Sequence, residues 1–209
     1  FSHAPNIENL SLSNEAAYVH YCPNETIQGN AIHKIPNIDK PLIADMSSVI
    51  LSEPIDVTKF SLIYAGAQKN IGPAGLTLVI IEKEFMQKDN SDLPNLLRYS
   101  QHAKSGSMLN TPPTFAWYMA GKVFKWIKKS GGLKFFKDQN DAKASMLYSC
   151  IDSDLFMAVA YKAKKMNKGC SNFRSLDVIV IIVEKRADVV DMSVLFLSDP
   201  SPIIGNACH

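Results

Sequence analysis

The chain has 209 residues, of which 46% are hydrophobic and 20% are charged, and its formal net charge is +2. This length and apolar content suffice for one folded domain and part of a second, and they exclude a disordered chain. The nearly balanced charge offers no basic face to a nucleic acid. The longest apolar run near the C-terminus, Val178 to Val183, is too short to span a bilayer. We therefore expect a globular protein with no nucleic-acid or membrane partner.

The cysteines and histidines give no sign of a metal site. The five histidines are dispersed, and no C-x-x-C or metal-ligand spacing occurs among the four cysteines, Cys22, Cys150, Cys170 and Cys208. Such spacing suits free or buried thiols in a reducing compartment. The N-terminus lacks the charged start and apolar core of a signal peptide. We expect a cytoplasmic protein without a bound metal.

The first informative element is the segment 41–48, P-L-I-A-D-M-S-S, which is typical of a short buried strand that ends in an acid, Asp45. A carboxylate in this place has two possible roles. It can partner a reactive group on a neighbouring strand, or it can cap the following segment or pair with a nearby basic residue.

Two apolar runs, 60–65 and 76–81, predict the next pair of strands, and the turn between them carries Lys69. Gly66 and the segment Gly72-Pro73-Ala74-Gly75 bound this turn, so its backbone can take positive φ angles and approach a ligand closely. If Lys69 is desolvated there, its neutral amine becomes accessible and can form a Schiff base with a carbonyl compound. The alternative is an ordinary solvated turn lysine.

A desolvated lysine and an aspartate on neighbouring strands, as expected for Lys69 and Asp45, form the pair that a pyridoxal phosphate site needs. The amine binds the aldehyde of the cofactor, and the carboxylate keeps the ring nitrogen protonated.

Further along, Asn110-Thr111-Pro112-Pro113 precedes a helical pattern over 115–127 and predicts a helix start. Thr111 is the expected N-cap, with the prolines in the first turn. A helix N-terminus also suits an anion, although capping alone is the alternative role for Asn110 and Thr111. Lysines and Gly131-Gly132 are expected to end this helix. Its apolar face is predicted from the residues that recur at helical spacing: Phe115, Met119, Val123, Trp126 and Ile127. For Trp117 and Trp126, core packing is the preferred role.

Four ordered blocks, within residues 17–27, 44–57, 63–77 and 107–118, resemble the phosphoserine aminotransferases, which are class V, fold type I pyridoxal phosphate enzymes. The most specific are A-G-A-Q-K-N around Lys69 and L-N-T-P-P-T around Thr111. The resemblance runs from about Ala17 to Ile151. It implies an α/β fold, the large domain of a fold type I transferase, with helices around a mixed, mostly parallel sheet.

The resemblance also implies roles for individual residues. Lys69 is expected to be the Schiff-base lysine and proton shuttle, and Asp45 the partner of the cofactor's ring nitrogen. Thr26 resembles the threonine that hydrogen-bonds the cofactor ring, and Gln68 resembles a contact to the cofactor phosphate. Asn110 and Thr111 match a pair that reaches the phosphate of the neighbouring subunit's cofactor. A homodimer with shared active sites follows from that match.

The reaction implied by the resemblance is the transfer of an amino group from L-glutamate to 3-phosphohydroxypyruvate. The products are O-phospho-L-serine and 2-oxoglutarate, in serine biosynthesis. An alternative is a catalytically silent fragment or homologue that keeps the fold and the dimer surface. A third class V possibility, a cysteine desulfurase, is disfavoured. In this chain Cys150, Cys170 and Cys208 lack a recognisable catalytic-loop context.

The domain prediction is a cofactor-binding part at 1–151 and a remnant or divergent C-terminal small domain at 152–209. The family pattern is lost after about Phe156, and the arginine-rich substrate segment of the family is not found, since the arginines are only Arg98, Arg174 and Arg186. We therefore expect a partial chain with an atypical C-terminal tail. Residues 164–167 weakly resemble the family's entry to the small domain, and segments 176–184 and 192–197 are predicted strands.

Overall fold

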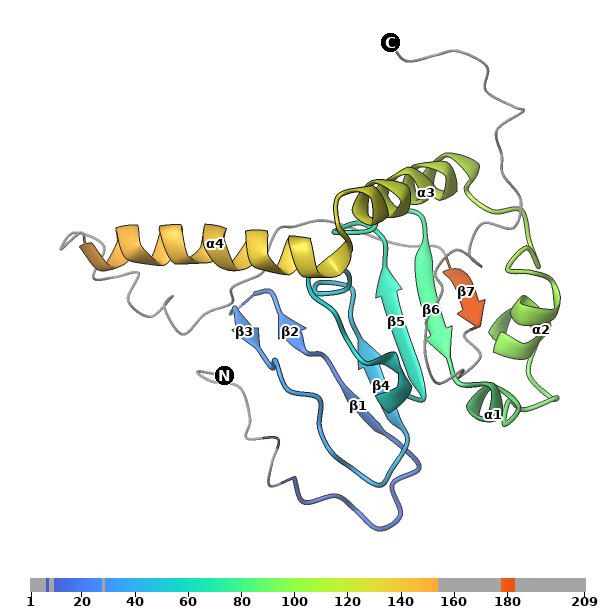
Figure 1. Ribbon diagram of the computed structural model, residues 1–209. Coiled ribbons are helices and arrows are strands. Elements are labelled where there is room, and N and C mark those ends of the chain that lie inside the picture. The colour runs from blue at the N-terminus through green and yellow to red at the C-terminus, as the bar shows by residue number, and fades with distance from the viewer. Residues whose placement is uncertain (1–6, 8–9, 28, 154–177, 183–209) are drawn as a thin grey trace, which may run out of the picture.

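The computed structural model describes residues 7, 10–27, 29–153 and 178–182 (Figure 1). The strands are β1 Val19–Tyr21, β2 Asn24–Glu25, β3 Asn30–Ala31, β4 Leu42–Asp45, β5 Leu62–Gly66, β6 Thr77–Ile81 and β7 Val178–Ile182. The α-helices are α1 Lys83–Met86, α2 Tyr99–Lys104, α3 Thr114–Lys129 and α4 Gly132–Ser153. The 3-10 turns include η2 Val57–Lys59 and η3 Asn95–Leu97.

A central sheet contains five strands in the order β1-β4-β5-β6-β7. The pairs β1–β4, β4–β5 and β6–β7 are parallel, whereas β5–β6 is antiparallel. A short turn links β5 to β6, as an antiparallel pair allows, and the longer connection from β4 to β5 lets those two strands run in the same direction. The predicted mixed, mostly parallel sheet is confirmed, and so are the three predicted strands that carry the candidate site.

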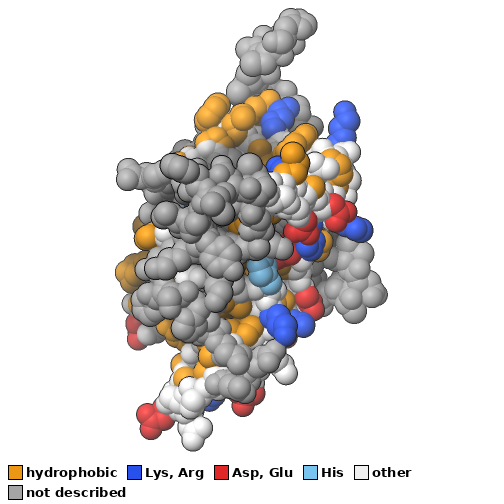
Figure 2. Space-filling model, turned by 90° about the vertical axis from the view of Figure 1, so that its left-hand side faces the viewer, with side chains coloured by type: hydrophobic (Ala, Val, Ile, Leu, Met, Phe, Trp, Pro, Cys, Tyr) orange, Lys and Arg blue, Asp and Glu red, His pale blue; other side chains and the backbone are white. Residues whose placement is uncertain are grey.

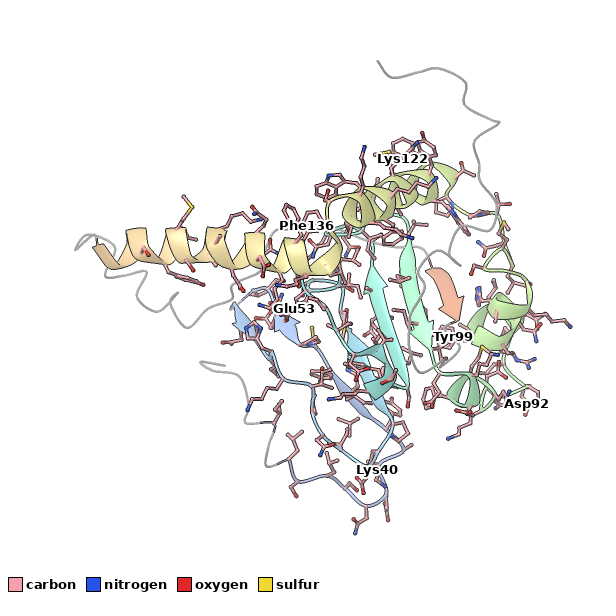
Figure 3. All side chains as sticks on the ribbon, in the orientation of Figure 1. Lys40, Glu53, Asp92, Tyr99, Lys122 and Phe136 are labelled. Carbon is pink, nitrogen blue, oxygen red and sulfur yellow. The ribbon has the colours of Figure 1, made fainter. Side chains whose placement is uncertain are left out.

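The strands β5 and β6 form the core of the sheet because they are apolar on both faces. Ile63 is 0% exposed on one face, and Val79 is 1% exposed on the other. The face with Ile63 packs against the main cluster, which includes Leu42 and Ala44. The second face packs against α1 and α2 through partly buried side chains that include Phe85 and Tyr99 (Figure 3). Near-continuous apolar strands such as these are typical of a sheet covered on both sides.

Helix α3 packs against the turn that follows β5 by using small side chains. Ala116 and Ala120 are each 4% exposed. A Cβ at Gly75 would lie 3.6 Å from the Ala116 Cβ, and one at Gly72 would lie 3.5 Å from the Ala120 amide nitrogen. Figure 1 shows α3 beyond the arrowhead of β5. The Lys69 turn therefore rests on a rigid helix.

This close approach explains where the predicted apolar face of α3 was wrong. Phe115 is 70% exposed and Trp126 is 57% exposed, so neither lies in the core. Only small side chains fit against the glycines of the turn, and this rotates the buried stripe to Ala116, Ala120 and Ile127. Trp117 does pack against the core, as expected.

The predicted start of α3 also needs correction, because Thr111 is not its cap. The helix begins at Thr114, and Pro113 occupies the N-cap position without any side-chain cap. A residue that precedes a proline is disfavoured in the helical region, so Thr111 and Pro112 stay outside the helix. The C-terminal end agrees with expectation, with Lys128 and Lys129 in the last turn and a positive φ of 105° at Gly131.

Helix α4 projects past the edge of the sheet in Figure 1, and it continues through the predicted boundary at residue 151 to Ser153. The strand expected within 176–184 is present as β7. The predictions for 164–167 and 192–197, and most of the predicted C-terminal domain, lie outside the described residues. Within the described part, no helix has the length and apolar character needed to cross a membrane. Figure 2 shows basic and acidic side chains intermingled on one face, in keeping with the small net charge.

Candidate active site

The site lies where three neighbouring parallel strands end. Because β1, β4 and β5 run in the same direction, their carboxyl ends meet at one edge of the sheet. Cys22 follows β1, Asp45 ends β4, and Gly66 ends β5 shortly before Lys69. Open α/β sheets bind ligands in crevices at this edge. The structure thus brings Asp45 and Lys69 to adjacent strand ends.

Asp45 is anchored by one of its two carboxylate oxygens. Its Oδ1 accepts a hydrogen bond from the Ser47 amide nitrogen at 2.9 Å and another from Ser47 Oγ at 2.6 Å. This is the local turn that an aspartate forms with the backbone two residues on. The capping role considered from the sequence is therefore real, but it uses only Oδ1, and Oδ2 takes part in neither bond.

The ends of β4 and β5 are tied together just beyond Asp45. The Gly66 amide nitrogen donates to Ser47 Oγ at 2.9 Å, and the Met46 amide nitrogen donates to the Tyr64 carbonyl at 2.8 Å. These bonds continue the strand pairing after the regular ladder stops at the Asp45–Tyr64 pair. The position of Asp45 relative to the Lys69 turn is fixed by this connection.

The Lys69 turn is closed by backbone hydrogen bonds. The Ala67 amide nitrogen donates to the Leu76 carbonyl at 2.9 Å, and the Gly72 amide nitrogen donates to the Ala67 carbonyl at 2.8 Å. Asn70 Nδ2 adds a bond to the Ile50 carbonyl at 2.8 Å. Lys69 itself is only partly buried, so the desolvation considered from the sequence is incomplete. The turn presents the lysine on an ordered backbone.

Cys22 lies close enough to both predicted catalytic residues to sense their charges. Burial is the main cause that raises the pKa of its thiol, and its hydrogen bond to the Asn24 carbonyl lowers that pKa. The Asp45 carboxylate raises the same pKa, and the Lys69 ammonium lowers it. Cys22, Asp45 and Lys69 therefore share one electrostatic environment at the strand edge.

Tyr64 lies directly opposite Asp45 in the β4–β5 register, and it contacts His20 on β1. The Tyr64 hydroxyl oxygen is 3.0 Å from His20 Nε2, and the two rings stack with centroids 5.9 Å apart. Burial raises the pKa of Tyr64, and the neighbouring Asp45 carboxylate raises it further. Tyr64 is thus held as a neutral phenol beside the carboxylate.

Gln68 and Gly66 form a cradle that a bound group could fill. Gln68 Oε1 is buried, and it has no hydrogen-bond partner within the described part of the chain. A Cβ at Gly66 would collide with the Gln68 side-chain amide. An unpaired amide beside a backbone without a side chain is a suitable contact for a ligand. Together with the amine of Lys69 and the carboxylate of Asp45, this donor set fits pyridoxal phosphate.

The remaining predicted site residues are less closely tied to this edge. Thr26 is partly buried in the turn between β2 and β3. Its hairpin is held to the segment after β4, because Asn24 Nδ2 donates to Ser48 Oγ at 2.8 Å and Ser48 Oγ donates to the Asn24 carbonyl at 2.7 Å. Asn110 and Thr111 are exposed in the connection between α2 and α3. Their predicted roles remain predictions.

Comparison with known proteins adds a family to this geometry. The sequence model of the family "Aminotransferase class-V" matches residues 5–184. The chain belongs to the class-V aminotransferases. The resemblance seen in the sequence is confirmed, and the family match continues past residue 156, where the sequence pattern was expected to be lost.

Two curated relatives of this class-V aminotransferase are named phosphoserine aminotransferase. The relative from Idiomarina loihiensis is 53% identical over 149 residues, which are 71% of this chain and 41% of the relative. The relative from Acinetobacter baylyi is 53% identical over 151 residues, which are 72% of this chain and 42% of the relative. The chain thus spans about two fifths of the length of these relatives.

Solved structures of phosphoserine aminotransferases share the fold. The enzyme from Bacillus circulans subsp. alkalophilus matches with a TM-score of 0.70 and 44% identity, over 72% of this chain and 42% of the solved chain. The pyridoxal phosphate-bound enzyme from Trichomonas vaginalis matches with a TM-score of 0.67 and 41% identity, over 73% and 45% of the two chains. These matches confirm the predicted fold type I architecture for the described sheet and helices.

Several site residues were not predicted from the sequence. Ser47 could have been found, because an aspartate followed two residues later by serine is a common turn signal. His20 and Tyr64 could not, because their contact depends on the register of β1, β4 and β5. The sequence near a tyrosine or histidine in a strand does not indicate which residue on another strand it contacts.

Proposed function

We propose that this class-V aminotransferase is a phosphoserine transaminase, which uses pyridoxal phosphate to move an amino group from L-glutamate to 3-phosphohydroxypyruvate. The products would be O-phospho-L-serine and 2-oxoglutarate, as in serine biosynthesis. The observation that carries the proposal is the placement of Asp45 and Lys69 at the ends of adjacent parallel strands. Relatives that share 53% identity and the name phosphoserine aminotransferase support the choice of substrates.

The proposed roles follow from the chemistry of each side chain. When bound, pyridoxal phosphate supplies an electron-accepting ring that stabilises negative charge on the substrate α-carbon. Lys69 holds the cofactor through Nζ and then uses Nζ to carry the proton that leaves and returns to carbon. Asp45 would hold the protonated ring nitrogen through its carboxylate, which Ser47 keeps in a fixed orientation. Gln68 would hold the phosphate by donating from its side-chain amide nitrogen, and Thr26 would lie beside the ring.

The proposal extends to the assembly and to the cell. We propose a homodimer in which Asn110 and Thr111 reach the cofactor phosphate of the partner subunit; their exposure in the structure is compatible with that role. We also propose that residues 1–151 form the cofactor-binding part, that residues 152–209 belong to a C-terminal small domain, and that the protein works in the cytoplasm.

The test is an amino-transfer assay with the purified chain, pyridoxal phosphate, L-glutamate and 3-phosphohydroxypyruvate. We expect 2-oxoglutarate to form with 3-phosphohydroxypyruvate and far more slowly with pyruvate as acceptor. Lys69→Ala should lower the rate by at least roughly a thousandfold, because Lys69 supplies the amine that holds the cofactor and carries the proton. Lys125→Ala is the matched control, since Lys125 is an exposed lysine on α3 and should leave the rate unchanged.

Two outcomes would contradict the proposal in different ways. Equal rates with pyruvate and 3-phosphohydroxypyruvate would overturn the substrate assignment. No transfer to any acceptor, by a chain that binds pyridoxal phosphate, would instead support the catalytically silent homologue.

A further inference from the structure

Ser47 joins the two strand ends that carry the candidate catalytic residues. Its hydroxyl donates to Asp45 Oδ1 at 2.6 Å and accepts from the Gly66 amide nitrogen at 2.9 Å. A serine hydroxyl has one proton and two acceptor sites, so these two bonds assign its proton to Asp45. The side chain is half-buried, which limits competition from water. Ser47 is therefore a fixed link between β4 and β5.

This link fixes the orientation of the Asp45 carboxylate. Both hydrogen bonds from Ser47 end on Oδ1, one from the backbone and one from the hydroxyl. Rotation of the carboxylate would break both, and a hydrogen bond to a charged group is stronger than one between neutral groups. The carboxylate is consequently held in one orientation, beside the Tyr64 hydroxyl that also hydrogen-bonds it.

Ser47 also affects the position of the turn that carries Lys69. Gly66 is the last residue of β5, and the turn to Lys69 begins at the next residue. The regular β4–β5 ladder stops at the Asp45–Tyr64 pair, so Ser47 Oγ provides the acceptor that the Gly66 amide needs beyond it. A shift of Ser47 would move Asp45 and the start of the lysine turn together.

We infer that Ser47 is a positioning residue, which orients Asp45 for the cofactor's ring nitrogen and holds the lysine turn at the matching position. The inference rests on the proposed use of pyridoxal phosphate. Ser47 itself touches neither substrate nor cofactor in this account, and it acts only through Asp45 and Gly66.

The test compares Ser47→Ala with Ser47→Thr, which keeps the hydroxyl. Ser52→Ala is the matched control, because Ser52 is also half-buried and its Oγ donates to the Val49 carbonyl at 2.6 Å, away from Asp45. The first readout needs no cofactor: hydrogen exchange at the Gly66 amide should accelerate in Ser47→Ala and stay near the unmodified rate in Ser47→Thr and Ser52→Ala.

The second readout is affinity for pyridoxal phosphate. Ser47→Ala should weaken binding roughly ten- to hundredfold, as expected for loss of a hydrogen bond to a charged group, and Ser47→Thr should restore most of it. In an Asp45→Asn background, Ser47→Ala should have little further effect, because both changes act on the same contact.

The outcomes separate this inference from the proposed function. Faster Gly66 exchange with unchanged affinity would make Ser47 a purely structural link and overturn the inference. Equal additional weakening by Ser47→Ala in the Asp45→Asn background would also overturn it. If the unmodified chain binds no pyridoxal phosphate, the proposed function fails and the positioning role fails with it, while the Gly66 exchange still reports whether the strand link exists.

Discussion

Tyr21 illustrates how a single half-buried phenol responds to its surroundings. Its ring stacks on Phe60 with centroids 6.5 Å apart and an interplanar angle of 4°. Burial, with a smaller contribution from Cys22, raises the pKa of Tyr21 from 10.0 to about 12. Because the neutral phenol is favoured in the folded state, its contribution to stability is complete below pH 10 and is lost as the pH rises toward 12.

The resulting prediction concerns unfolding at alkaline pH. Urea midpoints of the unmodified chain should fall more steeply between pH 10 and 12 than those of Tyr21→Phe, which has no phenol to ionise. Parallel curves for the two proteins would show that ionisation of Tyr21 is not linked to folding.

A second prediction about a single residue concerns Gly66. In Gly66→Ala, the new methyl group meets only the far end of the Gln68 side chain, which can move. We therefore expect little loss of stability, within about 1 kcal/mol, but displacement of Gln68 and a roughly tenfold loss of pyridoxal phosphate affinity. Gln68→Ala should match this loss, and the double variant should add nothing to it. If Gly66→Ala lowered the stability and left the affinity for pyridoxal phosphate unchanged, the proposed contact between Gln68 and the cofactor would be wrong.

Some residues of the candidate site could be predicted from the sequence, and others could not. Lys69 and Asp45 stand out because a glycine-bounded turn and an apolar strand each isolate one polar group. Ser47, His20 and Tyr64 gain their importance from neighbours on other strands, through bonds such as the one between Tyr64 and His20. Pairing across parallel strands depends on register, which local patterns do not determine.

Among the elements, α3 shows most clearly how packing overrides a local pattern. Its predicted apolar face included Phe115 and Trp126, but the close contact with Gly72 and Gly75 requires small residues instead. Trp126 lies at the junction with α4, where its ring centroid is 4.7 Å from that of Phe136 (Figure 3). By contrast, the strands β4, β5 and β6 were predicted correctly, since a long apolar run between turn residues leaves few other structures open.

The contact between helix α3 and the Lys69 turn gives a prediction about the packing of these two elements. Ala116→Leu should destabilise the protein by about 1–3 kcal/mol, because the larger side chain cannot fit against the backbone at Gly75. Urea unfolding is the measurement, and exposed Lys125→Ala on the same helix should stay within about 0.5 kcal/mol of the unmodified protein. Equal stability of Ala116→Leu would mean that α3 does not pack on the turn as described.

For the molecule as a whole, function depends on the sheet more than on any one element. The parallel direction of β1, β4 and β5 gathers their ends at one edge, and the antiparallel return of β6 creates the turn for Lys69. The overall α/β class was implied by the resemblance of four ordered sequence blocks to a known family, and the family match confirms it. The parallel pairing of β7 with β6 did not follow, since it joins segments far apart in the chain.

The central claim is that Lys69, which follows the strand adjacent to the one that Asp45 ends, is the residue that binds pyridoxal phosphate. The most direct test is to mix the purified chain with pyridoxal phosphate, reduce with borohydride and map the modified lysine by mass spectrometry. We predict a single dominant label on Lys69, which is absent from Lys69→Ala. Label scattered over surface lysines, or an unchanged pattern in Lys69→Ala, would contradict the account.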